Sequence, residues 1–138
     1  MDSFIVYGKP QPKQRPRVRS GGWTYTPRET LLYEEKVIQA AREQQALPDE
    51  PVAYAPLKMI IWCFCPIPTS WSKKKQAEAK KGNIYPINRT NGDIDNLAKI
   101  IMDALNGIYY DDDSQIAQLV INKRYDEEPR VEVLIDEM

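Results

Sequence analysis

Histidine is absent from this chain of 138 residues, and cysteine occurs only twice. Without histidine, the side chain that most often transfers protons near neutral pH is missing. The lack of a His/Cys set also excludes a zinc or iron site of the usual ligands. No Gly-rich loop of the kind that cradles phosphates is present. If the chain is an enzyme, we expect its chemistry to depend on carboxylates, lysine and a hard metal ion.

Long apolar runs are absent as well, since none approaches the roughly 18–20 residues that a membrane span requires. The N-terminal residues show neither the basic region nor the apolar region of a signal peptide. Cys63 and Cys65 lie two residues apart in an apolar stretch, a spacing that suits neither a disulfide nor a metal site. We therefore expect buried, reduced thiols in a cytoplasmic protein that does not associate with membranes.

Charge is unevenly distributed along the chain, although the formal net charge is only −1. Residues 1–30 contain six basic and two acidic side chains, a balance of +4, whereas residues 100–138 contain three basic and ten acidic ones, a balance of −7. This pattern suggests a basic channel for a polyanion that leads to an acidic, metal-binding end. The alternative is an ordinary solvated surface.

Alternation of apolar and turn-forming segments predicts a single α+β domain over residues 1–138, with one mixed sheet packed by helices. The stretch 57–65 is apolar at nearly every residue, so we expect a central strand covered on both faces. The last two strands should form a hairpin through residues 126–129. The expected strands are 4–8, 23–26, 57–65, 108–110, 116–125 and 130–135, and the expected helices are 26–45, 70–82 and 96–106.

Two helix starts can be predicted from capping residues. Thr26, Pro27 and Glu29 resemble a capping box with proline in the first position. Ser70 or Ser72 should cap the short lysine-rich helix, which Gly82 should end. The apolar stripe of the first helix is expected at Leu31, Leu32, Val37, Ile38 and Ala41.

The most informative segment is 93–115, in which two acidic groups flank an amphipathic helix. Asp93 and Asp95 stand at the helix start and could reach one cation. Asp112 and Asp113 follow after a helix and a Gly turn, an arrangement expected to return them toward the first pair. Lys99 points toward the same acidic end, where it could stabilise developing phosphate charge.

A purely structural interpretation of the same residues is also available. Asp95 could cap the helix, and Lys99 could pair with Asp95 or Asp103 four residues away. An EF-hand is excluded because the sixth position counted from Asp93 is Ala98 and not glycine. If a metal binds, carboxylates and water suit Mg²⁺ or Mn²⁺, whose usual work is phosphoryl transfer or phosphodiester hydrolysis.

Basic residues occur in two runs and at one position just before the Asp pair. Together they favour contact with a nucleic-acid backbone over a merely solvated surface. No interleaved aromatic pattern for base stacking is apparent, so recognition of backbone and shape is expected. The candidate DNA-binding residues are Lys9, Lys13, Arg15, Arg17, Lys73, Lys74, Lys75 and Arg89.

The segment D-I-D-N-L-x-K-x-x-x-D-A-L-x-G, followed by D-D-S-Q-I, resembles the RusA family of Holliday junction resolvases. The opening G-K-P-x-P-K-Q-R-P-R is similar to the N-terminal signature of many members, especially those of phage and prophage origin. The resemblance implies a small homodimeric fold that nicks four-way DNA junctions symmetrically with Mg²⁺, for which Mn²⁺ substitutes. It implies no small-molecule cofactor and no membrane partner.

Carried over by position, the metal-binding carboxylates would be Asp93, Asp95 and Asp113, with Asp112 next to them, and Lys99 would match the family's essential lysine. Asn91-Gly92 precedes the pair where proline or a basic residue is expected, and Asp111 is an extra acid. These departures leave open the role of Arg89 and the assignment within the triplet. Two rival functions also stay open: a less selective metal-dependent nuclease, and a catalytically idle, metal-stabilised DNA-binding module.

Overall fold

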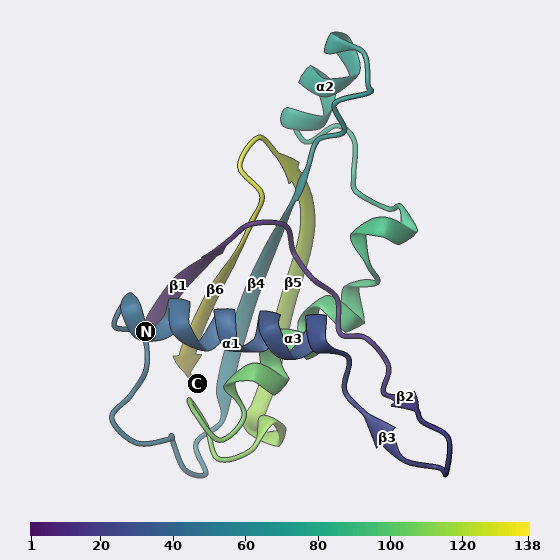
Figure 1. Cartoon of the computed structure of the whole chain (residues 1–138). Coiled ribbons are helices and arrows are strands. Elements are labelled where there is room, and N and C mark those ends of the chain that lie inside the picture. The colour runs from purple at the N-terminus through teal and green to yellow at the C-terminus, as the bar shows by residue number, and fades with distance from the viewer.

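A four-stranded mixed sheet forms the centre of the computed structural model, which describes all 138 residues (Figure 1). Three helices and two short 3₁₀ turns accompany it, so the α+β expectation is confirmed. The elements are β1 (Asp2–Tyr7), β2 (Arg17–Val18), β3 (Thr24–Tyr25), α1 (Arg28–Glu43), β4 (Leu57–Pro66), α2 (Lys73–Lys80), η1 (Arg89–Asn91), α3 (Ile94–Leu105), η2 (Asp113–Gln115), β5 (Ile116–Asp126) and β6 (Arg130–Glu137).

The strand order is β1-β6-β4-β5, which corrects the predicted terminal hairpin. β5 and β6 follow each other in the chain but do not pair, because β4 lies between them, parallel to β5 and antiparallel to β6. Three residues, 127–129, suffice for this connection, since two strand spacings amount to only about 10 Å. The prediction identified both strands but assigned each the wrong neighbour.

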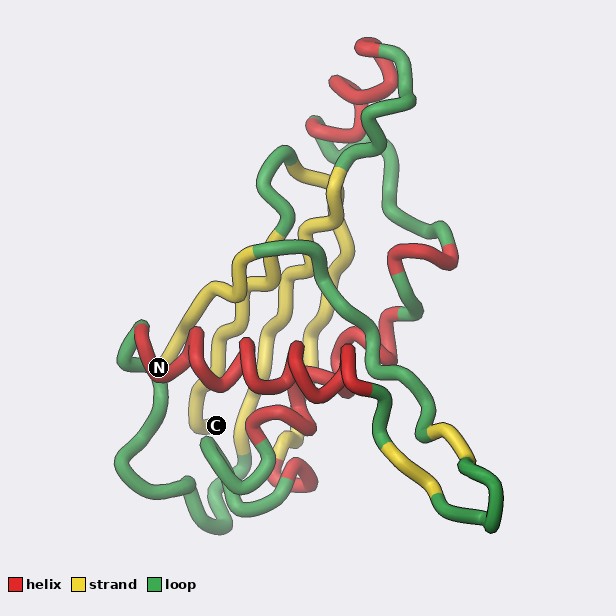
Figure 2. The backbone as a smooth tube through the Cα atoms, in the orientation of Figure 1, coloured by secondary structure: helices red, strands yellow, loops and turns green.

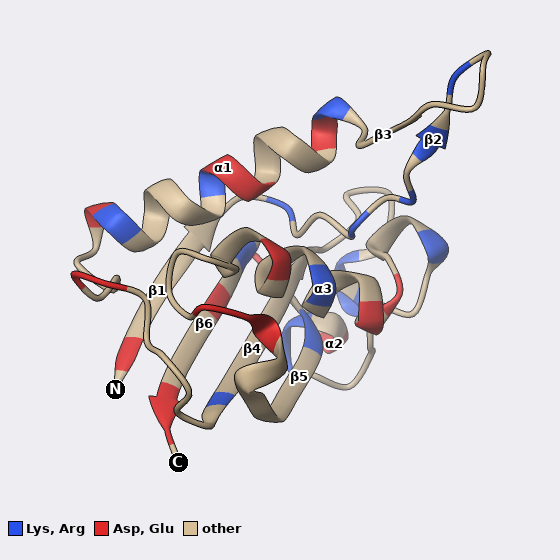
Figure 3. Ribbon diagram, turned by 90° about the horizontal axis from the view of Figure 1, so that it is seen from below, with Lys and Arg blue, Asp and Glu red and all other residues tan.

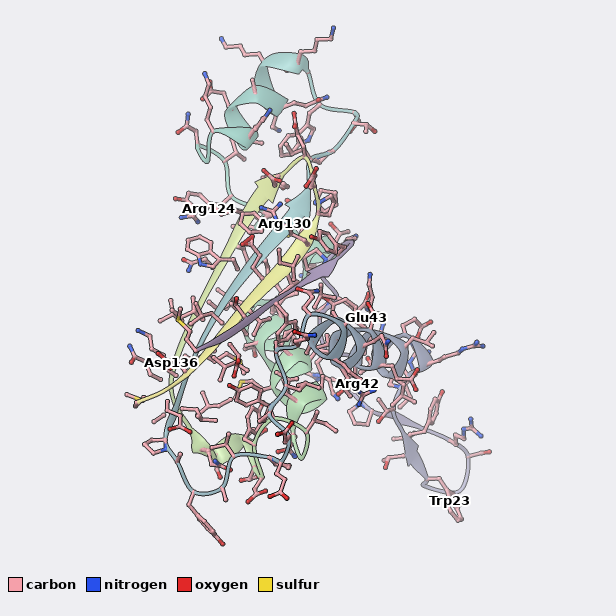
Figure 4. The ribbon with its side chains drawn as sticks, turned by 90° about the vertical axis from the view of Figure 1, so that its left-hand side faces the viewer. Trp23, Arg42, Glu43, Arg124, Arg130 and Asp136 are labelled. Atoms are coloured by element: carbon pink, nitrogen blue, oxygen red, sulfur yellow. The ribbon has the colours of Figure 1, made fainter.

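One face of the sheet carries the core, and both long helices pack against it. β4 alternates strictly, with Leu57, Met59, Ile61, Cys63 and Cys65 buried and the residues between them only partly buried. α1 and α3 contact each other on that buried side. Figure 4 shows Arg124, Arg130 and Asp136 on the opposite side, where no helix covers the sheet. β4 is central as predicted, but it is not covered on both faces.

Helix α1 begins one residue later than predicted, at Arg28. Pro27 occupies the cap position and no side chain caps the helix, so the proposed Thr26 capping box is wrong. Leu31 and Leu32 are 49% and 51% exposed, whereas Thr30 is fully buried, and its hydroxyl accepts a hydrogen bond from the backbone N–H of Gln14 at 3.3 Å. The inward side is formed by Thr30, Tyr33, Val37 and Ala41.

Helix α2 projects beyond one end of the sheet (Figure 1). Ser72 caps it by accepting a hydrogen bond from the N–H of Lys75 at 3.2 Å, as predicted. A small second hydrophobic core holds α2 against the sheet. In this core the rings of Trp71 and Tyr125 meet edge to face, with 5.3 Å between the ring centroids.

Residues 108–110, predicted as a strand, form a turn in which only Tyr110 makes isolated bridges. Tyr110 is fully buried, and its hydroxyl donates to the carbonyl of Met102 at 2.6 Å. The turn is held against α3 by this ring and by backbone hydrogen bonds from Ile108 and Tyr109 to the carbonyl of Leu105, not by strand pairing. Both cysteines are buried and free, as expected. No helix has the length and apolar character needed to cross a membrane.

Candidate nuclease site

The N-terminal end of α3 presents the first acidic pair to solvent. Asp93 is the cap residue in extended conformation, but its carboxylate caps no backbone N–H. Asp95 lies in the first turn, and both side chains are exposed. Neither carboxylate is engaged in an ion pair, so the interpretation of Asp95 as an N-cap is not supported. Both remain available to a ligand, and the helix dipole stabilises their negative charge.

The backbone just before Asp93 is fixed from two sides. Gly92 is buried with a φ of +82°, and a Cβ there would stand 2.7 Å from Cβ of Pro12, so the close contact requires glycine. From the sheet, Nζ of Lys123 donates to the carbonyl oxygen of Gly92 at 2.7 Å. The Asn91-Gly92 departure from the family pattern thus has a structural reason: it admits the loop that follows β1.

That loop runs alongside α3 (Figure 2) and contributes to the site directly. The N–H of Lys13 donates to the carbonyl of Asn96 in the first turn of α3, at 2.9 Å. A hollow at this crossing is lined by Arg89, Asp93 and Asn96 together with Pro12, Lys13 and Gly92. Arg89 therefore lies beside the acidic pair, as its place in the sequence suggested, with its side chain exposed.

Lys13 does not fit its predicted role as a DNA contact. Its side chain is only 18% exposed, and its ammonium lies 3.1 Å from Glu34 on α1 and 3.3 Å from Asp103 on α3. Burial lowers the pKa of Lys13, but hydrogen bonds and charges from these two carboxylates outweigh burial and raise it above 10.5. Lys13 thus joins the two helices, a use that a run of basic residues in sequence does not distinguish from phosphate binding.

Lys99 is exposed on α3, and no carboxylate pairs with it. Asp103, one of its two possible partners on the helix, is bound by Lys13 instead. The ordinary i,i+4 ion pair considered from the sequence is therefore not formed. Lys99 keeps an unpaired charge on the helix that carries Asp93 and Asp95.

The second acidic group is held at the other end of α3. The N–H of Asp113 donates to Oδ1 of Asn106 at 3.0 Å, directly after the last residue of the helix. Twelve residues of helix separate the two ends, about 18 Å at the usual rise. Nowhere in the chain do three acidic side chains stand close enough to share a metal ion. The predicted three-carboxylate cluster is thus not assembled.

Within the triplet, the acidic residues have different surroundings. The carboxylate of Asp112 caps η2 by accepting from the N–H and hydroxyl of Ser114, and it forms a reciprocal capping box with Gln115. Asp111 is exposed, and the half-buried Asp113 uses only its backbone. Burial, and then the charges of Asp113, Asp103 and Asp112, raise the pKa of Tyr110. Asp111 and Asp113 therefore both keep carboxylates that no hydrogen bond or ion pair engages, whereas that of Asp112 is used as a cap.

Asp93 and Asp95 fit the chemistry of a hydrated Mg²⁺ ion. Both supply hard oxygen donors that are exposed and unpaired. Mg²⁺ usually keeps several waters and is held by one or two carboxylates together with substrate phosphates, so a preformed set of three is not required.

Two groups of cations flank the N-terminus of α3. The first turn of α2 contains Lys73, Lys74 and Lys75 and no acidic residue. Positive charges at a helix N-terminus are unfavourable for helix stability. Their presence there is better explained by binding of an anion than by stabilisation of the helix. By contrast, Lys80 and Lys81 are paired with Glu127 and Glu78. On the other side, Lys9, Arg15 and Arg17 are exposed along the loop and β2 (Figure 3).

The sequence interpretation overlooked Lys123 and Pro12. The sequence did contain a signal for Lys123. This charged residue lies between Ile121 and the buried Tyr125, and all three side chains lie on the same side of strand β5. A charged residue in such a place needs a partner, here the carbonyl of Gly92. Pro12 carried no such signal, since its contact depends on how the loop folds back.

Comparison with known proteins identifies the family. The sequence model described as Endodeoxyribonuclease RusA matches residues 7–136, from the end of β1 almost to the end of β6. A Bacillus subtilis (strain 168) protein with the name Uncharacterized protein YqaN is 38% identical over 140 residues, 98% of this chain and 95% of that protein. The chain belongs to the RusA family of endodeoxyribonucleases.

Proposed function

We propose that this protein is a structure-specific endonuclease that resolves four-way DNA junctions by Mg²⁺-dependent hydrolysis, with Mn²⁺ as a substitute. The observation that carries the proposal is the unpaired Asp93–Asp95 pair at the N-terminus of α3, with Arg89 beside it and basic segments on both sides. Membership of the RusA family supports the nuclease class and the branched substrate.

The residues around this pair would have distinct roles. Asp93 and Asp95 would hold the cation without Asp113, which lies at the other end of α3. When bound, Mg²⁺ supplies the Lewis acidity that activates the attacking water and neutralises phosphate charge. The unpaired ammonium of Lys99 would stabilise the charge that develops on the phosphate. Arg89 would bind a phosphate at the edge of the hollow that it shares with Asp93.

The two basic groups would hold the DNA on either side of the cut. In Figure 1, η1 and the start of α3 lie between α2, at the top of the view, and the β2–β3 hairpin, at the lower right. Phosphates bound at both places would bring the backbone across the acidic pair. Such binding should weaken steeply as salt rises, because counterions are released on contact.

Symmetric cutting of two opposed strands requires two sites related by a two-fold axis, which a homodimer provides. We propose the uncovered face of the sheet as its interface. The middle of that face has the apolar pair Ile60 and Leu134, and beside it Trp62 lies next to the charged Glu132 in the register. Arg124 and Arg130 lie toward one end and Asp136 toward the other (Figure 4). A two-fold axis perpendicular to the strands would place the arginine end of one copy over the Asp136 end of the other.

One observation favours a second candidate function. Because no three acidic side chains stand together, the chain could serve as a catalytically idle DNA-binding module whose acids hold a structural cation. This candidate predicts that metal raises the melting temperature without any cleavage.

The deciding experiment incubates the protein and Mg²⁺ with a labelled four-way junction beside a linear duplex of the same sequence. Paired nicks near the crossover, on the junction alone, would support a resolvase. Cutting of both substrates would indicate a less selective nuclease. Binding without cleavage, in Mn²⁺ as well as Mg²⁺, would contradict the proposed activity and favour the idle module.

A further inference from the structure

The β2–β3 hairpin, residues 17–25, projects from the body of the protein as a finger (Figures 1 and 4). It is short and closed by the hydrogen bond from the N–H of Arg19 to the carbonyl of Trp23, at 2.7 Å. Figure 4 places Trp23 at the far end, pointing away from every other element. The finger therefore contributes nothing to the two hydrophobic cores.

The finger carries aromatic side chains, which can stack on planar ligands, and arginines, which can bind anionic groups. Trp23 is 75% exposed, an unusual use of a residue that normally buries its large ring. The guanidinium of Arg19 lies over the ring of Tyr25 at 4.6 Å, so a planar cation is held next to an aromatic face. The indole, in contrast, is not covered by any cation or ring.

The finger is held in a defined position relative to Asp93. Its base continues the loop that packs Pro12 on Gly92 and bonds Lys13 to Asn96. The ammonium of Lys13 then ties this loop to both α1 and α3. A ligand bound at the tip of the finger would thus have a defined position relative to Asp93 and Asp95.

Charge selects the kind of partner. From residue 3 to residue 28 the chain contains six basic side chains and no acidic one. Such a segment attracts a polyanion and repels a second copy of itself. An aromatic tip on a wholly basic arm matches nucleic acid, in which phosphates meet cations and bases stack on rings.

We infer that Trp23 stacks on DNA bases that have lost a stacking neighbour at a branch point, while Arg17 and Arg19 bind the adjoining phosphates. The inference rests on the proposed function, because it supplies the preference for branched over linear DNA. The interior of a linear duplex offers the indole no open base face, whereas the crossover of a four-way junction does. This adds base stacking to the backbone recognition expected from the sequence.

The test measures binding in EDTA, without cleavage, to a four-way junction and to a matched linear duplex. A 2-aminopurine placed at the crossover reports stacking through its fluorescence, and one placed in the middle of an arm serves as the reference. We expect wild-type protein to alter the signal at the crossover only. The W23A variant should lose that change and bind the junction about ten-fold more weakly, with duplex affinity unchanged.

Two further variants complete the design. W23F should retain most of the signal, since it keeps an aromatic face. Y54A is the matched control, because Tyr54 is 95% exposed in the α1–β4 connection, outside the finger, and its loss should change nothing. Circular dichroism melting and light scattering should show every variant folded and of wild-type oligomeric state.

Three results would overturn the inference: junction affinity equal for W23A and wild type, equal loss of affinity for junction and duplex, or a change of oligomeric state caused by W23A. These outcomes are separable from failure of the proposed function. A crossover signal that depends on Trp23 in a protein that never cleaves would keep the inference and reject the nuclease. If the protein cleaves the junction and W23A is as active as wild type, the nuclease proposal would stand and the inference about Trp23 would be rejected.

Discussion

Lys123 donates a hydrogen bond from its ammonium to the carbonyl oxygen of Gly92, the residue immediately before Asp93, at 2.7 Å. This bond connects the sheet to the first residue of the acidic pair without touching the carboxylate. Lys123 is therefore a positioning residue, and its effect on cleavage should pass through the backbone of the site.

Replacing Lys123 with methionine should lower the cleavage rate about ten- to a hundred-fold, because displacement of a catalytic group by about 1 Å has effects of this size. Junction binding should change little, since the ammonium faces the protein interior. Lys123→Arg should restore part of the rate by donating to the same carbonyl. Single-turnover cleavage and gel-shift assays on the three proteins would check this, and an equal loss of binding would contradict it.

Asp95→Asn should abolish cleavage and leave junction binding intact or tighter. The exposed carboxylate repels phosphate when no cation is bound, and the amide removes that repulsion without removing a contact. Gel shifts in EDTA, with nicking assays in Mg²⁺, measure the two effects separately. Weaker binding of the variant would place Asp95 in the DNA interface instead.

Lys99→Ala and Lys13→Ala form a matched pair, because both replace a lysine near α3. Lys99 is unpaired, so its loss should reduce cleavage with a melting temperature near that of wild type. Lys13 is bonded to Glu34 and Asp103, so its loss should destabilise the fold by about 2 kcal/mol. Denaturant unfolding of both variants tests the contrast. A large destabilisation by Lys99→Ala would assign that residue a structural role.

Cys63 should make the protein less stable at alkaline pH. Burial, and then the nearby charge of Cys65, raise the pKa of the Cys63 thiol from 9.0 to about 12, although Lys123 opposes the shift. Between these values the unfolded chain loses the proton while the folded protein keeps it. The free energy of unfolding should therefore fall as pH rises above 9, by up to about 1.4 kcal/mol per pH unit. Urea unfolding at pH 7.5 and pH 10 should show a smaller decline for Cys63→Ala, and an identical decline would contradict the assignment.

Leu134→Asp should convert the proposed dimer to a monomer while the chain stays folded, because it places a charge in the middle of the uncovered sheet face. Leu31→Asp is the control, since Leu31 is 49% exposed on α1, outside that face. Light scattering at micromolar concentration compares them. Dimers of unchanged stability in Leu134→Asp would rule out this face as the interface.

Much of the local structure could be predicted from the sequence because the signals were local. Ser72 caps α2 as expected, and β4 is central because its length and apolar character demand two neighbours. Asp93 and Asp95 lie at a helix start, where their spacing placed them. Each of these inferences depended on residues within one helical turn or one strand of each other.

The wrong predictions concern partners that are distant in the chain. Leu31 and Leu32 were predicted to face the core. Instead, the face of α1 that contains Thr30 is buried, and Thr30 contacts the loop at Gln14. The return of Asp113 to Asp93 was expected from element order alone, whereas the bond to Asn106 holds it at the opposite end of α3. Lys13 resembled its basic neighbours in sequence, and only the approach of two helices distinguishes it.

The position of β4 between β5 and β6 has a consequence for folding kinetics. β5 and β6 are separated by three residues, whereas β4 meets β5 across roughly sixty residues of chain. Pairing β5 directly with β6 is therefore the faster event and leads to a non-native hairpin, since short loops close first. To reach the native fold, β4 must insert between β5 and β6 before the non-native hairpin becomes stable, or the hairpin must open again afterwards.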